Sequence, residues 1–576
     1  MKAVQLTIYA TLLSGLFGCA QQPQQIDTPE PEPVAVTEPE PLPARPFTSD
    51  TLYALLSAEL AGSRGRLDVA LANYLQQAQQ TRDPQVAERA YMIARYMDAS
   101  DAIITSAALW AEASPDNQDA QAAAILAQID AGHLLEALER TRHAQTRDND
   151  ALLQSIAANA SNATDTQREL LLENYEQLLS EQPENVALLI STGLLHQQQG
   201  DLEGALELAE RAREIEPSNT PGLILTSGLL HQRGDNAAAL AVIKEQLDLA
   251  PGNRRLRLQY ARLLTFEHLE EAQEQFQILV NGSPSDSELL MALALVADER
   301  GDLETAQNSY QSLLDINEHT DEAHFYLGQL AEQNEQPEQA IQHYLKVQQG
   351  DDFAHAIARA LTIQLQLGNL QDTDELYQQL REQLPEQHER LALMYSQSLL
   401  EAGEDAAALT VLDDALLESP NNSNLLYARS MLHERAGDIA QAEADLRTIL
   451  EYDPNNPAAL NALGYILADR TERYTEAYEL IKRALEQQPN DPATIDSMGW
   501  VQYRLGNLAQ AQKYLEQAME LYPDDEIAAH LGEVLWVSGQ REAALNVWRS
   551  GLEIEPQSGY ILRTLQRLKI SADTPI

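Results

Sequence analysis

The chain has 576 residues, more than one hydrophobic core ordinarily supports, so it must form several domains or a repeat array. Apolar residues make up 44% but aromatic residues only 5%, strand-like alternation is nearly absent, and Ala, Leu, Gln and Glu favour helix. We therefore predict an all-α protein. With 89 acidic and 38 basic residues the formal net charge is −51, which opposes nucleic-acid binding. This charge either keeps a very large surface soluble or lines grooves that receive basic segments.

The first nineteen residues read as an export signal. The apolar stretch from Ala3 to Phe17 is too short to span a bilayer permanently but suits a signal peptide. It ends in Leu16-Phe17-Gly18-Cys19, which resembles the bacterial lipobox, where the cysteine is lipidated and becomes the mature N-terminus. The resemblance implies a signal peptide over residues 1–18, lipidation of Cys19 and, since no Asp follows, an outer-membrane location facing the periplasm of a Gram-negative bacterium. The alternative is an ordinary secretory signal with a chance cysteine.

Residues 19–47 form the next segment, the lipidated cysteine followed by a tether rich in Pro and Glu. Such a composition opposes helix and favours an extended polyproline conformation. At about 3.1 Å per residue the tether could hold the body up to about 80 Å from the membrane. A passive disordered linker is equally compatible with this sequence.

The rest of the chain repeats itself. Every residue of one C-terminal set recurs 33 places later in a second set: Gly499, Gly506, Ala511, Leu515, Ala518 and Pro523 in the first, then Gly532, Gly539, Ala544, Trp548, Gly551 and Pro556. Small residues keep a similar spacing at Ala477, Ala442, Ala408, Ala340, Ala306, Ala272, Ala205, Ala137 and Ala70. A period of about 34 residues with this pattern is the signature of the tetratricopeptide repeat (TPR), a pair of helices.

Each repeat has visible physical features. A Gly-Asp pair, such as Gly200-Asp201 or Gly437-Asp438, predicts the turn between the two helices. A proline then ends the second helix, and stacking on neighbouring repeats buries the apolar faces. We predict a TPR solenoid of about fifteen repeats in a right-handed superhelix over residues 48–558, followed by a capping helix and tail over 559–576. The predicted repeats begin near residues 51, 84, 118, 152, 186, 220, 253, 287, 321, 354, 389, 423, 457, 492 and 525.

No motif for catalysis is present. The sequence contains no phosphate-binding glycine loop, no HExxH and no GxSxG, and its histidines are scattered. Because repeats cover nearly the whole chain after Thr51, we predict a protein that is not an enzyme and that uses no cofactor or metal.

A partner is expected to bind in the groove lined by first helices. In TPR proteins the second, fifth, ninth, twelfth and thirteenth residues of each repeat face this groove. In the C-terminal repeats these positions hold Tyr427, Met431, Tyr465, Trp500, Tyr503 and Trp536. Interface hot spots favour such residues, so we predict an aromatic-lined binding groove. The alternative is that these side chains pack between neighbouring repeats.

A second candidate is a basic cluster on this acidic chain. Arg254 and Arg257 fall at groove-facing positions and could bind an acidic segment or a C-terminal carboxylate through paired hydrogen bonds. The alternative is that they form ion pairs with acidic residues of adjoining repeats.

Residues 461–556, which begin Asn461-Ala462-Leu463-Gly464, are more specific than a generic TPR. With the lipobox, the tether and the total length, the chain resembles bacterial TPR outer-membrane lipoproteins of the LbcA type. The resemblance implies an adaptor that binds and activates a periplasmic carboxyl-terminal processing serine protease and delivers peptidoglycan hydrolases to it.

Two other functions fit the same sequence. TPR lipoproteins also serve as scaffolds of envelope machines for outer-membrane protein insertion, pilus secretin assembly or polysaccharide export. Another possibility is an activator of a peptidoglycan synthase. The co-purifying partner would distinguish these functions from the adaptor.

Overall fold

The computed structural model describes residues 48–144, 146, 148–368 and 370–570, and the regular elements within these ranges are all helices. The predicted signal peptide, Cys19, the tether and residues 571–576 lie outside the described residues. The chain divides into two compact units, an N-terminal unit that ends at Glu318 and a C-terminal unit that begins at His319.

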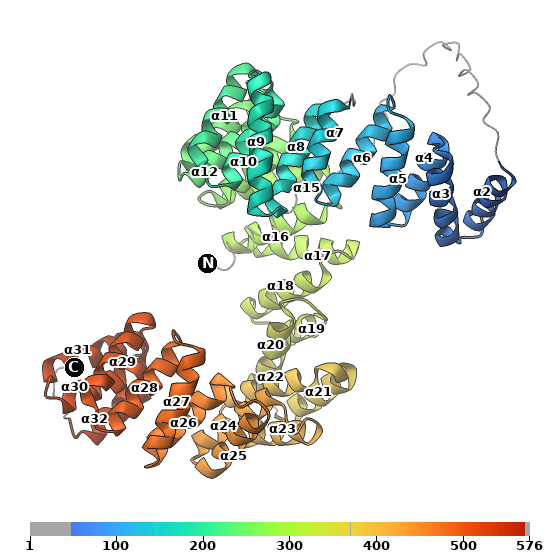
Figure 1. The fold of residues 1–576 in the computed structure, drawn as a ribbon. Coiled ribbons are helices and arrows are strands. Elements are labelled where there is room, and N and C mark those ends of the chain that lie inside the picture. The colour runs from blue at the N-terminus through green and yellow to red at the C-terminus, as the bar shows by residue number, and fades with distance from the viewer. Residues whose placement is uncertain (1–47, 145, 147, 369, 571–576) are drawn as a thin grey trace. The chain divides into compact units, whose positions relative to one another are not determined.

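In the N-terminal unit the helices follow one another in antiparallel pairs, each pair being one repeat (Figure 1). Their bounds are α2 Ser49–Gly62, α3 Leu67–Thr81, α4 Pro84–Tyr96, α5 Ser100–Ala113, α6 Gln118–Asp130, α7 Leu134–His143, α8 Asn149–Asn159, α9 Asp165–Glu181, α10 Val186–Gln198, α11 Leu202–Ile215, α12 Thr220–Gln232, α13 Asn236–Leu249, α14 Arg254–Leu264, α15 Leu269–Gly282, α16 Ser287–Arg300 and α17 Leu303–Ile316, with a short 3-10 turn, η1 Ala160–Asn162, between α8 and α9.

The C-terminal unit continues the pattern and ends with an unpaired helix, α32. Its helices are α18 Thr320–Gln333, α19 Pro337–Tyr344, α20 Phe353–Gln366, α21 Leu370–Gln383, α22 His388–Glu401, α23 Asp405–Glu418, α24 Ser423–Ala436, α25 Ile439–Tyr452, α26 Pro457–Arg470, α27 Tyr474–Gln487, α28 Pro492–Arg504, α29 Leu508–Leu521, α30 Asp525–Val537, α31 Arg541–Ile554 and α32 Gly559–Arg567, with η2 Pro385–Gln387 before α22. The predicted fold class, an all-α TPR solenoid, is confirmed.

Most first helices begin after a polar residue that caps them, and in many repeats this residue lies two places after a proline. The Asn185 side chain accepts a hydrogen bond from Leu188 N at 2.9 Å, and that of Asn456 accepts one from Ala459 N at 3.0 Å. These bonds satisfy N–H groups that have no partner inside the helix. The cap therefore fixes where most repeats start, whereas α18, α20 and α22 have no side-chain cap.

The turns within repeats follow the predicted Gly-Asp pairs. Gly200 and Gly437 have φ of +86° and +81°, a left-handed conformation that favours glycine and ends the first helix. The next residue caps the second helix, since Asp201 accepts a hydrogen bond from Gly204 N at 3.0 Å. One dipeptide thus ends one helix and starts the other.

The two helices of a repeat cross closely because small residues meet at the contact. The nine repeated alanines from Ala70 to Ala477 are all fully buried. A Cβ added at Gly532 would lie 2.1 Å from Nε1 of Trp548, and one at Gly499 would lie 2.6 Å from Cγ of Leu515. The bulky residue of the second helix fills the space that glycine leaves on the first.

We expect Gly532→Ala to destabilise the array by about 1–3 kcal/mol, because the added methyl group overpacks against Trp548. Urea unfolding followed by helical circular dichroism and tryptophan fluorescence measures this. The matched control is Gly228→Ala in α12, where nothing lies within 4 Å of the added Cβ, so helix propensity should leave it neutral or up to about 1 kcal/mol more stable. Equal effects of the two substitutions would contradict the close crossing.

Candidate functional site

Trp500, one of the two tryptophans among the predicted groove residues, lies inside the C-terminal unit. Its side chain is only 1% exposed. The ring stacks on His530 with centroids 4.2 Å apart and planes 24° apart, and it lies 5.1 Å from the ring of Tyr503. Trp500 therefore packs between repeats, as the alternative interpretation of its position described.

A buried ion pair adjoins this stack. His530 Nδ1 donates to Asp496 Oδ2 at 2.9 Å, and both side chains are buried. Burial by itself lowers the pKa of His530, but the charge of Asp496, the hydrogen bond to it and the charge of Glu526 outweigh burial and raise the pKa to about 9. At neutral pH His530 is therefore a cation held against a carboxylate.

A further hydrogen bond bridges repeats that are not neighbours in sequence. Tyr465 OH on α26 donates to Glu526 Oε1 on α30 at 2.7 Å. Burial raises the pKa of both Tyr465 and Glu526. This bond ties α26 to α30, the first helices of two repeats that are separated by the repeat of α28.

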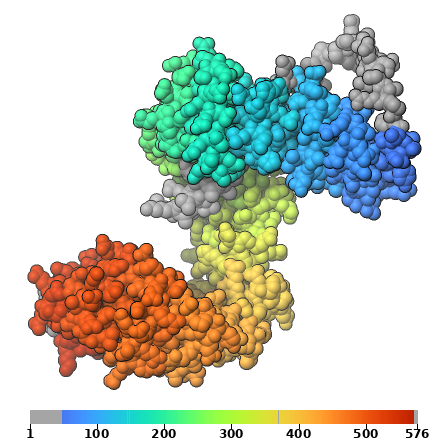
Figure 2. Space-filling model, in the orientation of Figure 1, coloured from blue at the N-terminus to red at the C-terminus, as the bar shows by residue number. Residues whose placement is uncertain are grey.

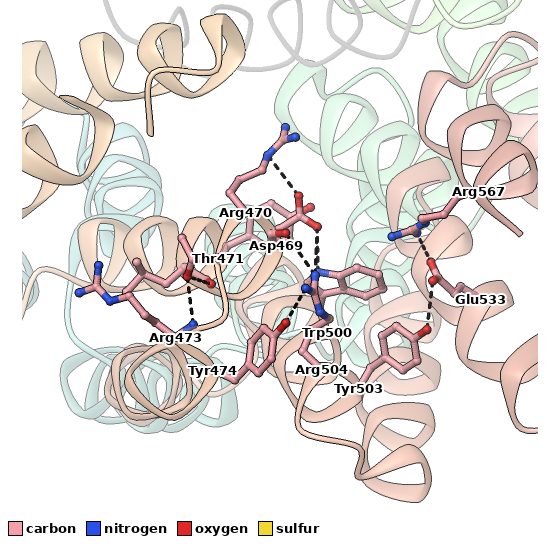
Figure 3. A network of polar contacts seen from close by, with 12 residues as sticks. Asp469, Arg470, Thr471, Arg473, Tyr474, Trp500, Tyr503, Arg504, Glu533 and Arg567 are labelled. Atoms are coloured by element: carbon pink, nitrogen blue, oxygen red, sulfur yellow. Dashed lines mark hydrogen bonds and ion pairs between the residues drawn. The ribbon is translucent and has the colours of Figure 1, made fainter. Parts of the chain in front are cut away.

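Figure 3 shows how α32 joins the same network. Tyr503 OH donates to Glu533 Oε1 at 3.1 Å, and the guanidinium of Arg567 on α32 pairs with the same carboxylate. The Arg567 guanidinium also lies 5.8 Å from the centroid of the Trp500 ring. The indole Nε1 of Trp500 in turn donates to Asp469 Oδ1 on α26 at 3.2 Å. Burial raises the pKa of Glu533, so Arg567 compensates a carboxylate that is poorly solvated.

The remaining aromatic candidates are half-buried. Trp536 lies 5.8 Å from the ring of Trp548, and the guanidinium of Arg541 lies 5.1 Å from the Trp536 centroid. Tyr427 and Met431 pack against the main hydrophobic cluster of the C-terminal unit, and burial raises the pKa of Tyr427. The inner face of the last repeats is therefore largely filled by the chain's own side chains.

The basic candidates lie on α14, in the N-terminal unit. The Arg254 guanidinium pairs with Asp286 of the following repeat at 2.7 Å and also donates to Ser283 Oγ. Arg257 donates to Gln275 Oε1 at 2.5 Å and to the carbonyl oxygen of Pro251 at 2.7 Å. Arg254 thus makes the ion pair expected of a structural residue, whereas Arg257 bonds two neutral acceptors.

The first three repeats carry the exposed apolar residues that the predicted groove required. Leu52, Met92, Tyr96 and Leu126 occupy the second, ninth, thirteenth and ninth positions of the repeats that begin near residues 51, 84 and 118, so they line the inner face. Tyr96 is 82% exposed and the other three are about half exposed. We call these four residues the exposed row. Because these exposed apolar residues share one face, the exposed row is the candidate contact surface for a partner.

The sequence prediction missed this row and the buried charges. The same groove-facing positions predict both sets: Asp496, Glu526 and Glu533 occupy the fifth, second and ninth positions of their repeats. The prediction rested on the side chains at groove positions of the C-terminal repeats and on Arg254 and Arg257, and it named no individual acidic residue and no residue of the first three repeats.

Within the described ranges, no group of three or more His, Cys, Asp or Glu residues is arranged to hold a metal ion. None of the helices in the same part of the chain is long and apolar enough to cross a membrane.

Stacked helix pairs with an exposed apolar inner face define a helical-repeat protein of the scaffold type, which mediates protein interactions. The tetratricopeptide repeat family matches residues 172–220, 291–355 and 427–492, and again 494–525. The chain is 38% identical over 488 residues to "TPR repeat-containing protein PA4667" of Pseudomonas aeruginosa, which covers 84% of this chain and 82% of that protein. The chain belongs to the TPR repeat-containing protein family.

Solved structures with similarity to the chain are more distant. The complex of Naa15/Naa10 bound to HypK-THB is 18% identical, with 73% of this chain and 71% of that chain covered and a TM-score of 0.34. Yeast Tom70 is 14% identical, with 73% of this chain and 95% of that chain covered and a TM-score of 0.34.

The ion pair of His530 makes stability depend on pH. Because its folded pKa of about 9 lies above the ordinary 6.5, its contribution is complete below pH 6.5 and is lost as pH rises through about 9. Burial also raises the pKa of Glu526 and of Glu533. Protonation of these two carboxylates in more acidic solution therefore favours the folded state.

We therefore expect the C-terminal unit to lose up to about 3 kcal/mol of unfolding free energy between about pH 6.5 and pH 9.5, and His530→Gln to lose much less. Urea unfolding followed by tryptophan fluorescence at the two pH values measures this difference. The same pH dependence in both proteins would show that the folded structure does not raise the pKa of His530.

Proposed function

We propose that the chain is a non-enzymatic, lipid-anchored adaptor of the Gram-negative periplasm, which binds and activates a carboxyl-terminal processing serine protease and delivers peptidoglycan hydrolases to it. The observation that carries protein binding is the exposed row, Leu52, Met92, Tyr96 and Leu126. The identity of the partners comes from the resemblance of residues 461–556 to the LbcA-type lipoproteins.

The exposed row has the chemistry of a binding surface. A tyrosine supplies a large, rigid contact area, whereas methionine and leucine adapt to the shape of an apolar partner. Because this surface occupies only the first three repeats, the remaining repeats offer separate faces for a second protein. Protease and substrate held on one chain react at the high effective concentration of linked binding sites.

The N-terminal sequence supports a location at the cell wall. A lipidated Cys19 would anchor the chain through several acyl chains, which is sufficient for stable membrane attachment. The Pro/Glu-rich tether would then let the array reach proteins that act on peptidoglycan.

A pull-down of the tagged mature chain from solubilised envelopes tests the proposed function. We expect mass spectrometry to identify a carboxyl-terminal processing serine protease, together with peptidoglycan hydrolases that are retained when the protease nucleophile is replaced by alanine. Recovery of a secretin, a barrel-assembly complex or a peptidoglycan synthase without any protease would favour the scaffold or synthase-activator function instead.

Acidic substitutions in the exposed row should weaken recovery of the protease in this pull-down. We expect Met92→Glu combined with Tyr96→Glu to reduce the recovered protease by at least about tenfold, because both residues are apolar contacts at an interface. The matched control is Leu417→Glu on α23, an exposed apolar residue of a second helix, which should leave recovery unchanged. Undiminished recovery with the double variant would exclude the row as the protease contact.

Replacement of the lipidation site tests the anchor. We expect Cys19→Ser to move the protein from the membrane fraction to the soluble periplasm, since no acyl chain can then be attached. Fractionation of cells followed by immunoblotting measures this, and a variant that still sediments with outer membranes would refute the lipoprotein assignment.

A further inference from the structure

The interface between consecutive repeats has a recurring pattern. In most repeats the third and tenth residues of the first helix are buried, and most of them are apolar, where the second helix of the preceding repeat packs. In α10 these are Leu188 and Leu195, each 1% exposed, and α9 packs against them as the preceding helix. In α16 they are Leu289 and Val296, both buried beside α15.

The same positions are uncovered in α2. Its third and tenth residues, counted from Thr51, are Tyr53 and Leu60, which are 75% and 58% exposed, and Leu56 between them is also more than half exposed. Gly65 and Ala70 hold the same places relative to α2 as Gly200 and Ala205 hold relative to α10, so the register is certain. We call Tyr53, Leu56 and Leu60 the end face. Within the described residues, which begin at residue 48, no helix precedes α2 to cover this repeat interface.

The opposite end of the array is treated differently. There α32 closes the last repeat: Ile561 is fully buried in the cluster formed with Trp548 and Ala528. Terminal repeats of solenoids ordinarily present a polar outer face. Because α2 instead presents three large apolar side chains, its end face is built to be covered.

If residues 1–18 are removed as a signal peptide, as predicted, the mature chain offers little to cover the end face. Residues 20–47 precede α2 and are rich in proline, which opposes the helix that the interface requires. A second copy would bring two chains of formal net charge −51 together, and such a charge keeps proteins apart. A helix from a different protein meets neither obstacle.

We propose that the end face of α2 docks an amphipathic helix of a partner protein, which takes the place of the second helix of a preceding repeat. The end face corresponds to the interface between consecutive repeats. A partner helix with apolar residues at i, i+3 or i+4, and i+7 on one side therefore recognises it. This deepens the proposed function, since it names the kind of element by which a partner is held, and it rests on the adaptor role.

A helix of the chain itself serves as the probe. Residues 165–181 form α9, which covers the corresponding face of α10 and buries Leu171, Tyr175 and Leu178. A fluorescein-labelled peptide of this sequence, held helical by a hydrocarbon staple on its exposed side, is titrated with the full mature chain while fluorescence anisotropy is recorded. This measurement involves no protease, so its result is independent of the pull-down.

We expect saturable binding to the wild-type chain, weakened at least about tenfold by Leu60→Glu and unchanged by Leu417→Glu, which places the same charge on another exposed leucine. A control peptide with Leu171→Glu and Leu178→Glu should not bind. Absence of binding to the wild-type chain, or equal binding to the Leu60→Glu variant, would overturn the proposal.

Size-exclusion chromatography with light scattering tests whether a second copy of the chain covers the end face instead. We expect the wild-type chain and the Leu60→Glu variant both to be monomers at micromolar concentration. A wild-type dimer that Leu60→Glu converts to a monomer would mean that a second copy covers the end face, and this result would overturn the proposal of a foreign helix.

Discussion

The array depends on a contact that recurs in several repeats, that of a small residue on the first helix against a large one on the second where the two helices cross. Gly532 against Trp548 and Gly499 against Leu515 bring the helices of a repeat close together, and the next first helix then closes the open side. No single pair can bury its apolar face alone, so each repeat is stable only through its neighbours. This dependence makes the ends of the array special: the last repeat has α32, whereas α2 keeps apolar side chains in solvent.

The inner face of the last repeats shows how a groove can be filled from within. Asp496 and Glu533 are buried carboxylates, and their desolvation is tolerable because His530 and Arg567 supply opposite charges at hydrogen-bonding distance. A buried ion pair contributes little net stability, because both charges lose their hydration. Loss of either partner is nevertheless strongly destabilising, since it leaves the other charge buried without a partner. These bonds, and the bridge from Tyr465 to Glu526, hold consecutive first helices in one arrangement. Binding at this face would have to break them, whereas binding at the exposed row breaks nothing.

The sequence predicted the fold well because a repeat's signals are local. The starts expected near residues 186, 220, 457 and 492 coincide with the first residues of α10, α12, α26 and α28, since a capping Asn or Asp precedes each helix and a proline lies two residues before that cap. The site was harder to predict. Trp500 has the identity and the position of an interface hot spot, yet its burial depends on how consecutive repeats rotate against one another, as the 61-residue span from Tyr465 to Glu526 illustrates. Residue type and spacing carry no information about that rotation. The exposed row follows from the same positional argument, but only one of its four residues, Tyr96, is aromatic, whereas the C-terminal groove positions hold five aromatic residues.

The central claim is that partners bind the open inner face of the first repeats and not the filled face of the last ones. Hydrogen–deuterium exchange of the full mature chain, alone and with the protein captured from the envelope, tests it most directly. Slower exchange on binding in α2, α4 and α6, with α26, α28 and α30 already protected in the free chain and unchanged in the complex, is the predicted result. Protection that appears instead in α24 to α30 would contradict the account, because it would place the partner on the aromatic groove that the chain's own side chains occupy.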